Sequence, residues 1–142
     1  MKTFEASLPI RASRETIWKI LTNAAEYQTW NTTVETVDGR IALNEKITVH
    51  PKNSGGRAFP AKVAEFVPDK RMIWAGGMPL GLFKGVRTFT LTDRGDGTVE
   101  FRMGEVFSGL LSPLIERSIP DLQPAFEEFA AALKTAAEKV RS

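Results

Sequence analysis

The last stretch of the chain, Asp121 to Arg141, constrains the fold more than any other. Its apolar residues recur at steps of three and four, which places them on one face of an α-helix. They are Leu122, Phe126, Phe129, Leu133, Ala136, Ala137 and Val140. Asp121 suits the N-cap, and Pro124 suits the first turn, where a missing N–H costs little. Such a helix would be about 30 Å long, so its apolar face needs an equally long partner. We therefore expect the β-like segments between residues 34 and 107 to form a sheet wrapped around this helix.

The N-terminal part of the chain predicts one strand and two short helices. Lys2 to Ile10 alternates polar and apolar residues, and Pro9 favours a position at the sheet edge. A helix begins after Ser13 as its N-cap, and we expect it to end near Ala25. Glu26 to Asn31 predicts a second, brief helical turn packed by aromatic side chains.

The middle of the chain predicts a run of antiparallel strands. The expected strands are Val34–Leu43, Lys46–Pro51, Phe59–Val67, Arg71–Ala75, Lys84–Arg94 and Thr98–Ser108. Lys52 to Gly56 predicts a loop, and Pro68 with Asp69 predicts a turn. We interpret Gly76 to Leu82, rich in glycine and apolar residues, as too irregular for a strand: it is either a cover over an opening or an ordinary connection. Leu110 to Ile119 predicts one or two helical turns. Because no βαβ repetition occurs, we expect an α+β fold with six to seven antiparallel strands, in one domain spanning residues 1–142.

The turn Gly95-Asp96-Gly97 determines which side chains of its hairpin face inward. With Arg94 opposite Thr98, the predicted pairs are Leu91–Phe101, Phe89–Met103 and Arg87–Glu105. The opposite parity of both strands is hydrophilic, so these pairs belong to the inner face. Arg87 and Glu105 are charged residues on an apolar face, and each therefore needs a partner. Either they form a structural salt bridge, or Arg87 anchors a carboxylate or polarises a carbonyl of a ligand.

Composition limits the classes of function. The chain has 19 Lys and Arg against 17 Asp and Glu, and no basic run interleaved with aromatic residues. We therefore expect neither a nucleic-acid partner nor a membrane-surface role. With no Cys and one His, the chain offers no cysteine-based or multi-histidine metal site, and we expect no metal and no cofactor. No apolar run approaches the roughly 20 residues of a membrane span, and no apolar leader begins the chain, so we expect a cytoplasmic protein.

Four segments carry a resemblance to a known family, namely Ala12–Thr22, Tyr27–Asn31, Val67–Trp74 and Glu105–Leu111. In this order and spacing they closely resemble the START-like (SRPBCC) superfamily, within its polyketide cyclase/dehydrase-type branch. The resemblance implies the helix-grip fold, in which a curved antiparallel sheet grips the C-terminal helix and leaves a cavity between them. Similar members bind lipids, sterols, polyketides or other hydrophobic small molecules, and a minority catalyse cyclisation or dehydration. Relatives often carry a His two residues before the Phe of the sixth strand, whereas this chain has Arg87 there.

The candidate ligand-binding residues are those expected between the sheet and the helix. They are Trp30, Asn31, Met72, Trp74, Arg87, Phe89, Phe101, Met103, Glu105, Leu114, Phe126 and Phe129. Trp30 and Asn31 would lie near the cavity mouth, or form a packing and capping pair. The large aromatic and Met side chains suit either a filled core or an adaptable hydrophobic pocket.

The leading functional hypothesis is a monomer or homodimer that binds a hydrophobic small molecule, such as a lipid or polyketide, for transport or sequestration. The second is an aromatase/cyclase-type enzyme. It ranks below binding because the inward acid–base groups are limited to Glu105 and Arg87, and we assign no catalytic residue. The third is a protein-interaction module, as in relatives of the chaperone ATPase activators that share this fold. A cavity filled by its own side chains, together with an exposed apolar patch around Met78 to Phe83, would favour this third hypothesis.

Overall fold

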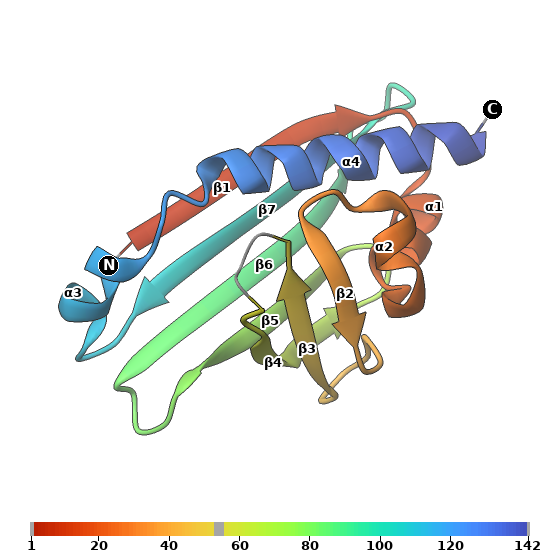
Figure 1. Ribbon diagram of the computed structural model, residues 1–142. Helices are drawn as coiled ribbons and strands as arrows, with labels where there is room; N and C mark the ends of the chain where they lie inside the picture. Colours follow the sequence, from red (N-terminus) through yellow and green to blue (C-terminus); the bar gives the residue numbers. More distant parts are fainter. Residues whose placement is uncertain (1, 53–55, 142) are drawn as a thin grey trace.

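The computed structural model describes residues 2–52 and 56–141, and shows a curved antiparallel sheet with a long C-terminal helix lying across one face (Figure 1). In chain order the elements are β1 (Lys2–Ile10), α1 (Arg14–Leu21), the 3-10 turn η1 (Ala24–Glu26), α2 (Tyr27–Trp30), β2 (Val34–Asp38), β3 (Lys46–Pro51), β4 (Phe59–Val67), β5 (Arg71–Met78), β6 (Phe83–Asp93), β7 (Val99–Ser108), α3 (Ser112–Ile115), the 3-10 turn η2 (Glu116–Ser118) and α4 (Gln123–Arg141). The strand order is β1-β7-β6-β5-β4-β3-β2. The predicted α+β helix-grip architecture is therefore confirmed.

Helix α4 packs its apolar face against β1 and β7 (Figure 1). Hydrogen bonds join its two ends to β1 and to Arg11, the residue after β1. At its start the backbone N–H of Gln123 donates to the Asp121 carboxylate at 3.0 Å. Because α4 begins at Gln123, Leu122 takes the N-cap position that was predicted for Asp121, and Asp121 lies one residue before it. The Gln123 side chain also donates to the carbonyl of Glu5 at 2.6 Å. Near its end the Glu138 carboxylate accepts the N–H of Arg11 at 2.9 Å. These bonds hold the helix parallel to the sheet, with one stripe of side chains buried. The stripe consists of Phe126, Phe129, Ala130, Leu133 and Ala137.

The first helix begins where the sequence predicts but ends earlier. Ser13 Oγ accepts the backbone N–H of Thr16 at 3.1 Å, which confirms the N-cap. The helix α1 ends at Leu21 instead of near Ala25. Its last turn is closed by other donors, because the hydroxyls of Thr22 and Tyr27 donate to the carbonyls of Trp18 and Leu21. The chain then continues through η1 into α2, the predicted second helical turn.

Substitution of Ser13 by alanine is expected to lower the free energy of unfolding by about 1 kcal/mol, because the N–H of Thr16 loses its acceptor. Urea unfolding measures the change. Ser7→Ala, at an exposed position of β1, is the control and should stay within about 0.5 kcal/mol. Equal stability of the two variants would show that the cap bond contributes nothing.

Two strand boundaries differ from the prediction, and a glycine explains each. Strand β2 ends at Asp38 instead of Leu43, because Gly39 has φ +100° and a Cβ there would lie 2.7 Å from the carbonyl oxygen of Lys46. The prediction that residues 76–82 cannot form a strand is wrong up to Met78, where β5 ends. Within that extension, a Cβ on Gly77 would lie 2.3 Å from the carbonyl oxygen of Phe83, so glycine lets the two strands approach. The predicted loop at residues 52–56 falls largely outside the described residues.

The hairpin of β6 and β7 has the predicted register. Its pairs include Leu91–Phe101, Phe89–Met103 and Arg87–Glu105. Both strands begin or end within one residue of their expected bounds. Strand β1 lies at the sheet edge, as Pro9 predicts. The buried inner face of this hairpin therefore meets α4, and it carries the charged pair with it.

Candidate functional site

Arg87 and Glu105 belong to a row of side chains that crosses the sheet on the face toward α4. The register places Trp74 opposite Arg87, and Glu105 lies between Arg87 and Phe4. Residues directly opposite one another point to the same face. The Arg87 guanidinium lies 4.8 Å from the ring centroid of Phe126 on α4, so this row faces the helix. The row separates two halves of the inner face that differ in burial.

The half toward the turn between β6 and β7, which we call the deep half, is filled by aromatic side chains. The Phe129 ring lies 5.9 Å from that of Phe89 and 6.4 Å from that of Phe101, centroid to centroid. Trp74 lies 4.8 Å from Phe89. Five of the predicted ligand-lining residues are at most 2% exposed here, namely Met72, Phe89, Phe101, Met103 and Phe129. These five residues therefore fill a core instead of lining an open pocket.

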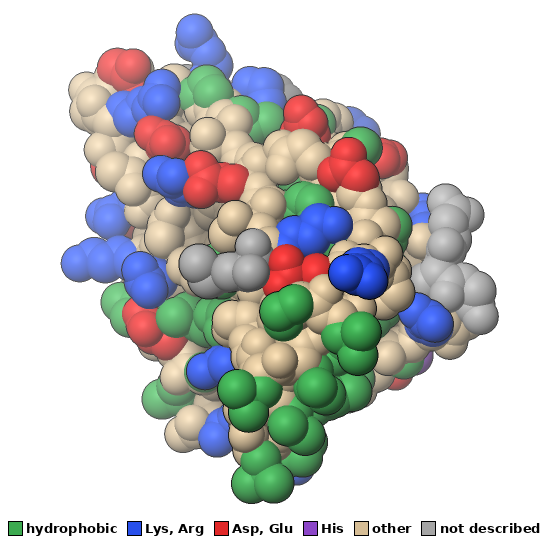
Figure 2. All heavy atoms as spheres, turned by 90° about the vertical axis from the view of Figure 1, so that its left-hand side faces the viewer, with side chains coloured by type: hydrophobic (Ala, Val, Ile, Leu, Met, Phe, Trp, Pro, Cys, Tyr) green, Lys and Arg blue, Asp and Glu red, His purple; other side chains and the backbone are tan. Residues whose placement is uncertain are grey.

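The half beyond the charged row, which we call the open half, is only partly buried. The side chains of Arg87 and Glu105 are 21% and 13% exposed. Beyond them Gly76 faces Gly85, and the half-buried ring of Phe107 follows along β7. Figure 2 faces this end of the molecule and shows acidic and basic side chains adjacent near the middle, with hydrophobic side chains gathered below them. The open half therefore places apolar surface beside an ion pair.

Arg87 uses only part of its hydrogen-bonding capacity within the protein. Its Nε donates to Glu105 Oε1 at 2.6 Å. No hydrogen bond of its two terminal amino groups is found among residues 2–52 and 56–141. Phe126 holds the guanidinium plane through a cation–π contact. The pair is thus a salt bridge, as one alternative predicts, but it leaves two amino groups, with four N–H donors, available to a carboxylate or carbonyl.

Three further donors beside this row are buried without a partner in the described part of the chain. They are Trp30 Nε1, Asn31 Nδ2 and Trp74 Nε1. The ring of Tyr27 lies 4.9 Å from that of Trp30 and 6.5 Å from that of Trp74, so the two indoles flank one tyrosine. An unpaired buried donor costs about 1–3 kcal/mol.

Asn31 also performs the capping role that the sequence analysis considered. It is 1% exposed, so it does not lie at an open mouth. Its Oδ1 accepts the backbone N–H groups of Thr33 and Val34 at 2.8 and 3.1 Å. Trp30 packs edge-on against Phe129, with centroids 5.6 Å apart. Trp30 therefore packs and Asn31 caps, as one of the two alternatives predicts. The Asn31 amide nitrogen has no hydrogen-bond partner in the described part of the chain.

Tyr27 is a residue of this site whose role sequence reasoning limited to packing. Its hydroxyl donates to the carbonyl of Leu21. Burial raises the pKa of the Tyr27 hydroxyl above its ordinary value, and the positive charge of Arg87 opposes this shift only in part. The Tyr27 hydroxyl is therefore neutral and hydrogen-bonded, and the ring packs against the other aromatic side chains. Its place in the aromatic cluster depends on how α2 docks on the sheet, which no local pattern specifies. Phe107, by contrast, shares the parity of Glu105 and could have been found from the hairpin register.

Leu114 does not lie where it was expected. It is 69% exposed, whereas Ser112 in the same helical turn is 2% exposed. The helix α3 has a single turn, and residues two positions apart lie on nearly opposite sides of a helix. Because Ser112 faces inward, Leu114 faces away from the space between the sheet and α4.

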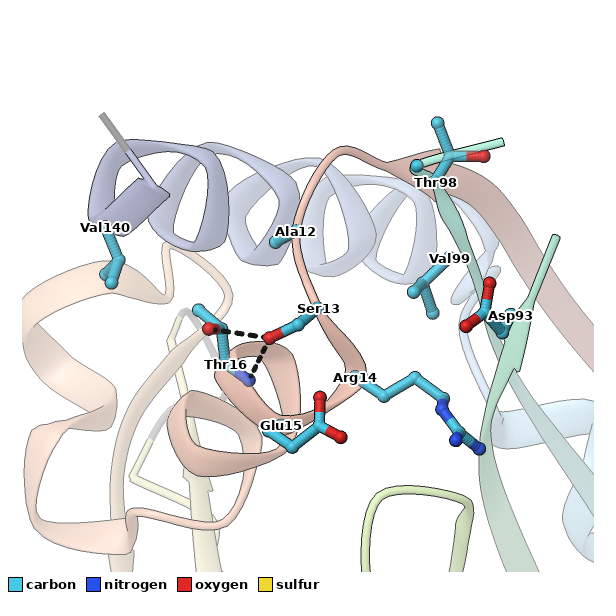
Figure 3. A pocket seen from close by; sticks show the side chains of 10 residues that line it. Ala12, Ser13, Arg14, Glu15, Thr16, Asp93, Thr98, Val99 and Val140 are labelled. Carbon is cyan, nitrogen blue, oxygen red and sulfur yellow. Dashed lines mark hydrogen bonds between the residues drawn. The ribbon is translucent and has the colours of Figure 1, made fainter. Parts of the chain in front are cut away.

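Two surface hollows lie away from these residues. One, of about 460 Å³, lies between the start of α1, the turn after β6 and the end of α4 (Figure 3). Figure 3 shows Ser13 directed at Thr16 across the first turn of α1, which is the cap bond described above. The other, of about 290 Å³, lies between β1 and α4. Neither contains a candidate ligand-binding residue.

Comparison with known proteins identifies a family and a shared fold. The chain matches, over residues 1–138, the family model described as polyketide cyclase/dehydrase and lipid transport. No curated protein sequence matches the chain significantly. Among residues 2–52 and 56–141, no helix combines the length and apolar character needed to span a bilayer.

Three solved structures illustrate the shared fold. The di-domain ARO/CYC protein BexL from the BE-7585A biosynthetic pathway is 15% identical to this chain, with a TM-score of 0.74. The match covers 100% of this chain and 48% of BexL, so this chain spans about half the length of BexL. A START superfamily protein from Mycobacterium smegmatis is 16% identical, with a TM-score of 0.71 and coverage of 97% and 98%. Protein MLL2253 from Mesorhizobium loti is 21% identical, with a TM-score of 0.75 and the same coverage. At such identities the likeness concerns the fold alone.

Proposed function

Because the chain belongs to the polyketide cyclase/dehydrase and lipid transport family of the START-like (SRPBCC) superfamily, we propose that it binds a hydrophobic small molecule, for transport or sequestration, on the open half of its inner face. The observation that carries this proposal is Arg87. Its half-buried guanidinium is held in place by Glu105 and Phe126. The two terminal amino groups have no hydrogen-bond acceptor among the described residues.

The chemistry of this group favours a ligand with an oxygen acceptor at one end. A guanidinium with two available N–H₂ groups binds a carboxylate or carbonyl by paired hydrogen bonds. Glu105 already balances the charge of Arg87, so a neutral carbonyl would avoid the repulsion that a carboxylate would meet at Glu105. The apolar remainder of the ligand would then lie on the open half, against Phe107 and the glycine pair of β5 and β6.

Binding is favoured over catalysis because the candidate acid–base groups are engaged. Glu105 accepts the Nε–H of Arg87, and the Tyr27 hydroxyl donates to a backbone carbonyl. A general acid or base must reach the reacting atoms of its substrate. A polyketide cyclase-type reaction at this site would require Glu105 to leave its partner. Glu105→Gln would then abolish turnover while ligand was still bound.

Removal of the charged pair is expected to lower affinity for a carbonyl-bearing ligand selectively. The variant Arg87→Met/Glu105→Leu removes both partners, so neither charge is left unpaired. Hydrogen bonds to charged groups contribute about 1.5–3 kcal/mol, so affinity for 2-dodecanone should fall roughly 10- to 100-fold. Affinity for dodecane should change less than about threefold. Quenching of tryptophan fluorescence and calorimetry with 2-dodecanone, dodecanoate and dodecane measure these changes.

The control exploits a second arginine–glutamate pair on the outer face. Arg102 contacts Glu5 at 2.5 Å, with both side chains more than half exposed. Arg102→Met/Glu5→Leu should leave all three affinities unchanged. An equal loss of dodecanone and dodecane binding in the Arg87 variant would show that the pair is purely structural. The wild-type protein is also tested with 2-acetylnaphthalene, an aromatic ketone. If it bound neither 2-dodecanone nor 2-acetylnaphthalene, the proposal itself would be wrong.

A protein-interaction module is the second candidate, and two observations favour it. The deep half of the inner face is filled by Phe89, Phe101 and Phe129, as this hypothesis requires. An apolar patch also remains exposed, since Met78 and Leu80 are 49% and 90% exposed. The Arg87 donors are not explained by this hypothesis, which is why small-molecule binding ranks first.

A further inference from the structure

The carboxylate of Glu105 has one oxygen that is bonded inside the protein and one that is not. Oε1 accepts the Nε–H of Arg87 at 2.6 Å. Oε2 accepts no hydrogen bond from residues 2–52 and 56–141. It lies over Gly85, since a Cβ at that position would be 3.2 Å away. Gly85 is the next residue of the inner face beyond Arg87, in the direction of the open half. The free oxygen of Glu105 is therefore on the side where the proposed ligand lies.

Glycine at position 85 leaves the space that this oxygen occupies. A Cβ there would also be 3.1 Å from Cε1 of Phe107, which is closer than ordinary van der Waals contact. The ring and the carboxylate would both have to move if any side chain were present. Gly85 thus allows Glu105 to keep Oε2 on the inner face, beside the amino groups of Arg87.

Three phenylalanine rings border the ion pair and limit its contact with water. Phe4 lies opposite Glu105 on β1, and its ring centroid is 6.0 Å from that of Phe126 and 6.3 Å from that of Phe107. Phe126 in turn contacts the guanidinium of Arg87. Hydrogen bonds are stronger, and unpaired polar groups cost more, in such a surrounding of low polarity. A ligand that covered the pair would therefore be selected by how well it satisfied both charged residues.

We propose, on the basis of the proposed function, that the ligand is a neutral carboxamide with an apolar chain, and that Glu105 selects it. The amide oxygen would accept hydrogen bonds from the amino groups of Arg87, and the amide N–H would donate to Glu105 Oε2. A carboxamide carries its acceptor and its donor on two atoms, which suits a site whose donor and acceptor come from two neighbouring side chains.

Other polar groups satisfy this site less well. A ketone offers an acceptor alone, so it would cover Oε2 and leave it unpaired. A carboxylate would place a second negative charge beside Glu105. A site that bonds an N–H of its ligand discriminates strongly against an analogue that lacks the N–H. Glu105 is therefore the residue expected to determine specificity, whereas Arg87 contributes affinity for any carbonyl.

The apolar chain of the amide would continue along the open half past Phe107. Gly76, Gly85 and Phe107 lie in one row across β5, β6 and β7. Phe107 is the one side chain that these three strands contribute to the row, because the other two positions are glycine. Its ring stacks on that of Phe83, with centroids 5.7 Å apart and 13° between the planes. These two half-buried rings provide apolar surface next to the polar anchor.

Three related ligands test the selection on the wild-type protein. Undecanamide and 2-dodecanone share the same alkyl chain and carbonyl, and differ in an NH₂ group against a methyl group. N,N-Dimethylundecanamide keeps the amide carbonyl but has no N–H. Calorimetry and tryptophan fluorescence measure the dissociation constants. Wild-type protein should bind undecanamide roughly tenfold or more tightly than either of the other two ligands.

The variant Glu105→Gln separates this selection from binding itself. A glutamine can still accept the Nε–H of Arg87 through its carbonyl oxygen, but it places an NH₂ donor where Oε2 lies. The preference for undecanamide over 2-dodecanone should therefore fall about tenfold or more, while affinity for 2-dodecanone should fall by less than about threefold. Glu5→Gln is the matched control in the outer-face pair with Arg102, and should leave the preference unchanged.

The outcomes distinguish this inference from the proposed function. Binding of 2-dodecanone by the wild type without a preference for undecanamide, or a preference that persists in Glu105→Gln, would overturn the carboxamide proposal alone. Binding of neither the amides nor the ketone would overturn the proposed function with it. The wild-type series requires no substitution, so it decides the question even if Glu105→Gln fails to fold.

Discussion

Replacement of Phe129 by alanine is expected to lower the free energy of unfolding by about 3–5 kcal/mol. The ring is 2% exposed, and its centroid lies between 5.6 and 6.4 Å from four other aromatic rings. These rings come from α2, β6 and β7, so Phe129 joins the helix to both the sheet and the short α2 turn. Because the interior is close-packed, its neighbours cannot collapse fully into the space that the ring leaves.

Urea unfolding followed by circular dichroism measures this loss, which also corresponds to a decrease of about 10–20 °C in melting temperature. Val140→Ala is the control on the same helix, because Val140 is 66% exposed; it should change stability by less than about 0.5 kcal/mol. Phe129→Leu should fall between them, at about 1–2 kcal/mol. If Phe129→Ala were as mild as Val140→Ala, the deep half of the inner face would hold free space instead of a packed core.

Replacement of Gly77 by alanine is expected to cost roughly 2–4 kcal/mol. Gly77 has φ +136°, which L side chains rarely adopt. A Cβ there would also lie 2.3 Å from the carbonyl oxygen of Phe83 and 2.9 Å from the Cα of Lys84. Both contacts are with backbone, so the end of β5 would have to separate from β6. The turn that carries Leu80 would move with it.

The control is Gly81→Ala in the same turn. Gly81 also has positive φ, at +69°, but no atom lies within 4 Å of its ideal Cβ among the described residues. This substitution should cost only about 1–2 kcal/mol, the penalty of a left-handed backbone for alanine. Hydrogen exchange should accelerate for the amides of residues 76–85 in Gly77→Ala and stay slow at Phe101. Equal effects of the two substitutions would contradict the continuation of β5 to Met78.

The inner face could be predicted in part, since local chemistry specifies a hairpin. Gly95 and Gly97 allow a short turn, and side chains alternate with a period of two. Together these place Arg87 opposite Glu105 without any long-range information. The salt bridge is therefore predictable. The two unused amino groups of Arg87 are not predictable, because their position depends on the contact of the guanidinium with Phe126 of α4.

The occupancy of the space between sheet and helix could not be predicted. Phe89, Phe101 and Met103 have the same size and polarity whether they line a pocket or fill a core. The distance of α4 from the sheet decides between the two. Contacts that contribute to that distance include hydrogen bonds such as Gln123 to Glu5, which joins residues 118 positions apart.

The amino-acid sequence by itself determined the elements whose signals are local. They include the amphipathic helix α4, the Ser13 cap, the edge position of β1 and the register that pairs Arg87 with Glu105. Tertiary structure alone decided which half of the inner face is filled, how far β5 continues past Gly76, and that Leu114 faces solvent. The physical reason is the range of the interactions. Capping hydrogen bonds and side-chain periodicity act within a turn or a hairpin, whereas packing volume and exposure depend on segments that meet only after the sheet has formed.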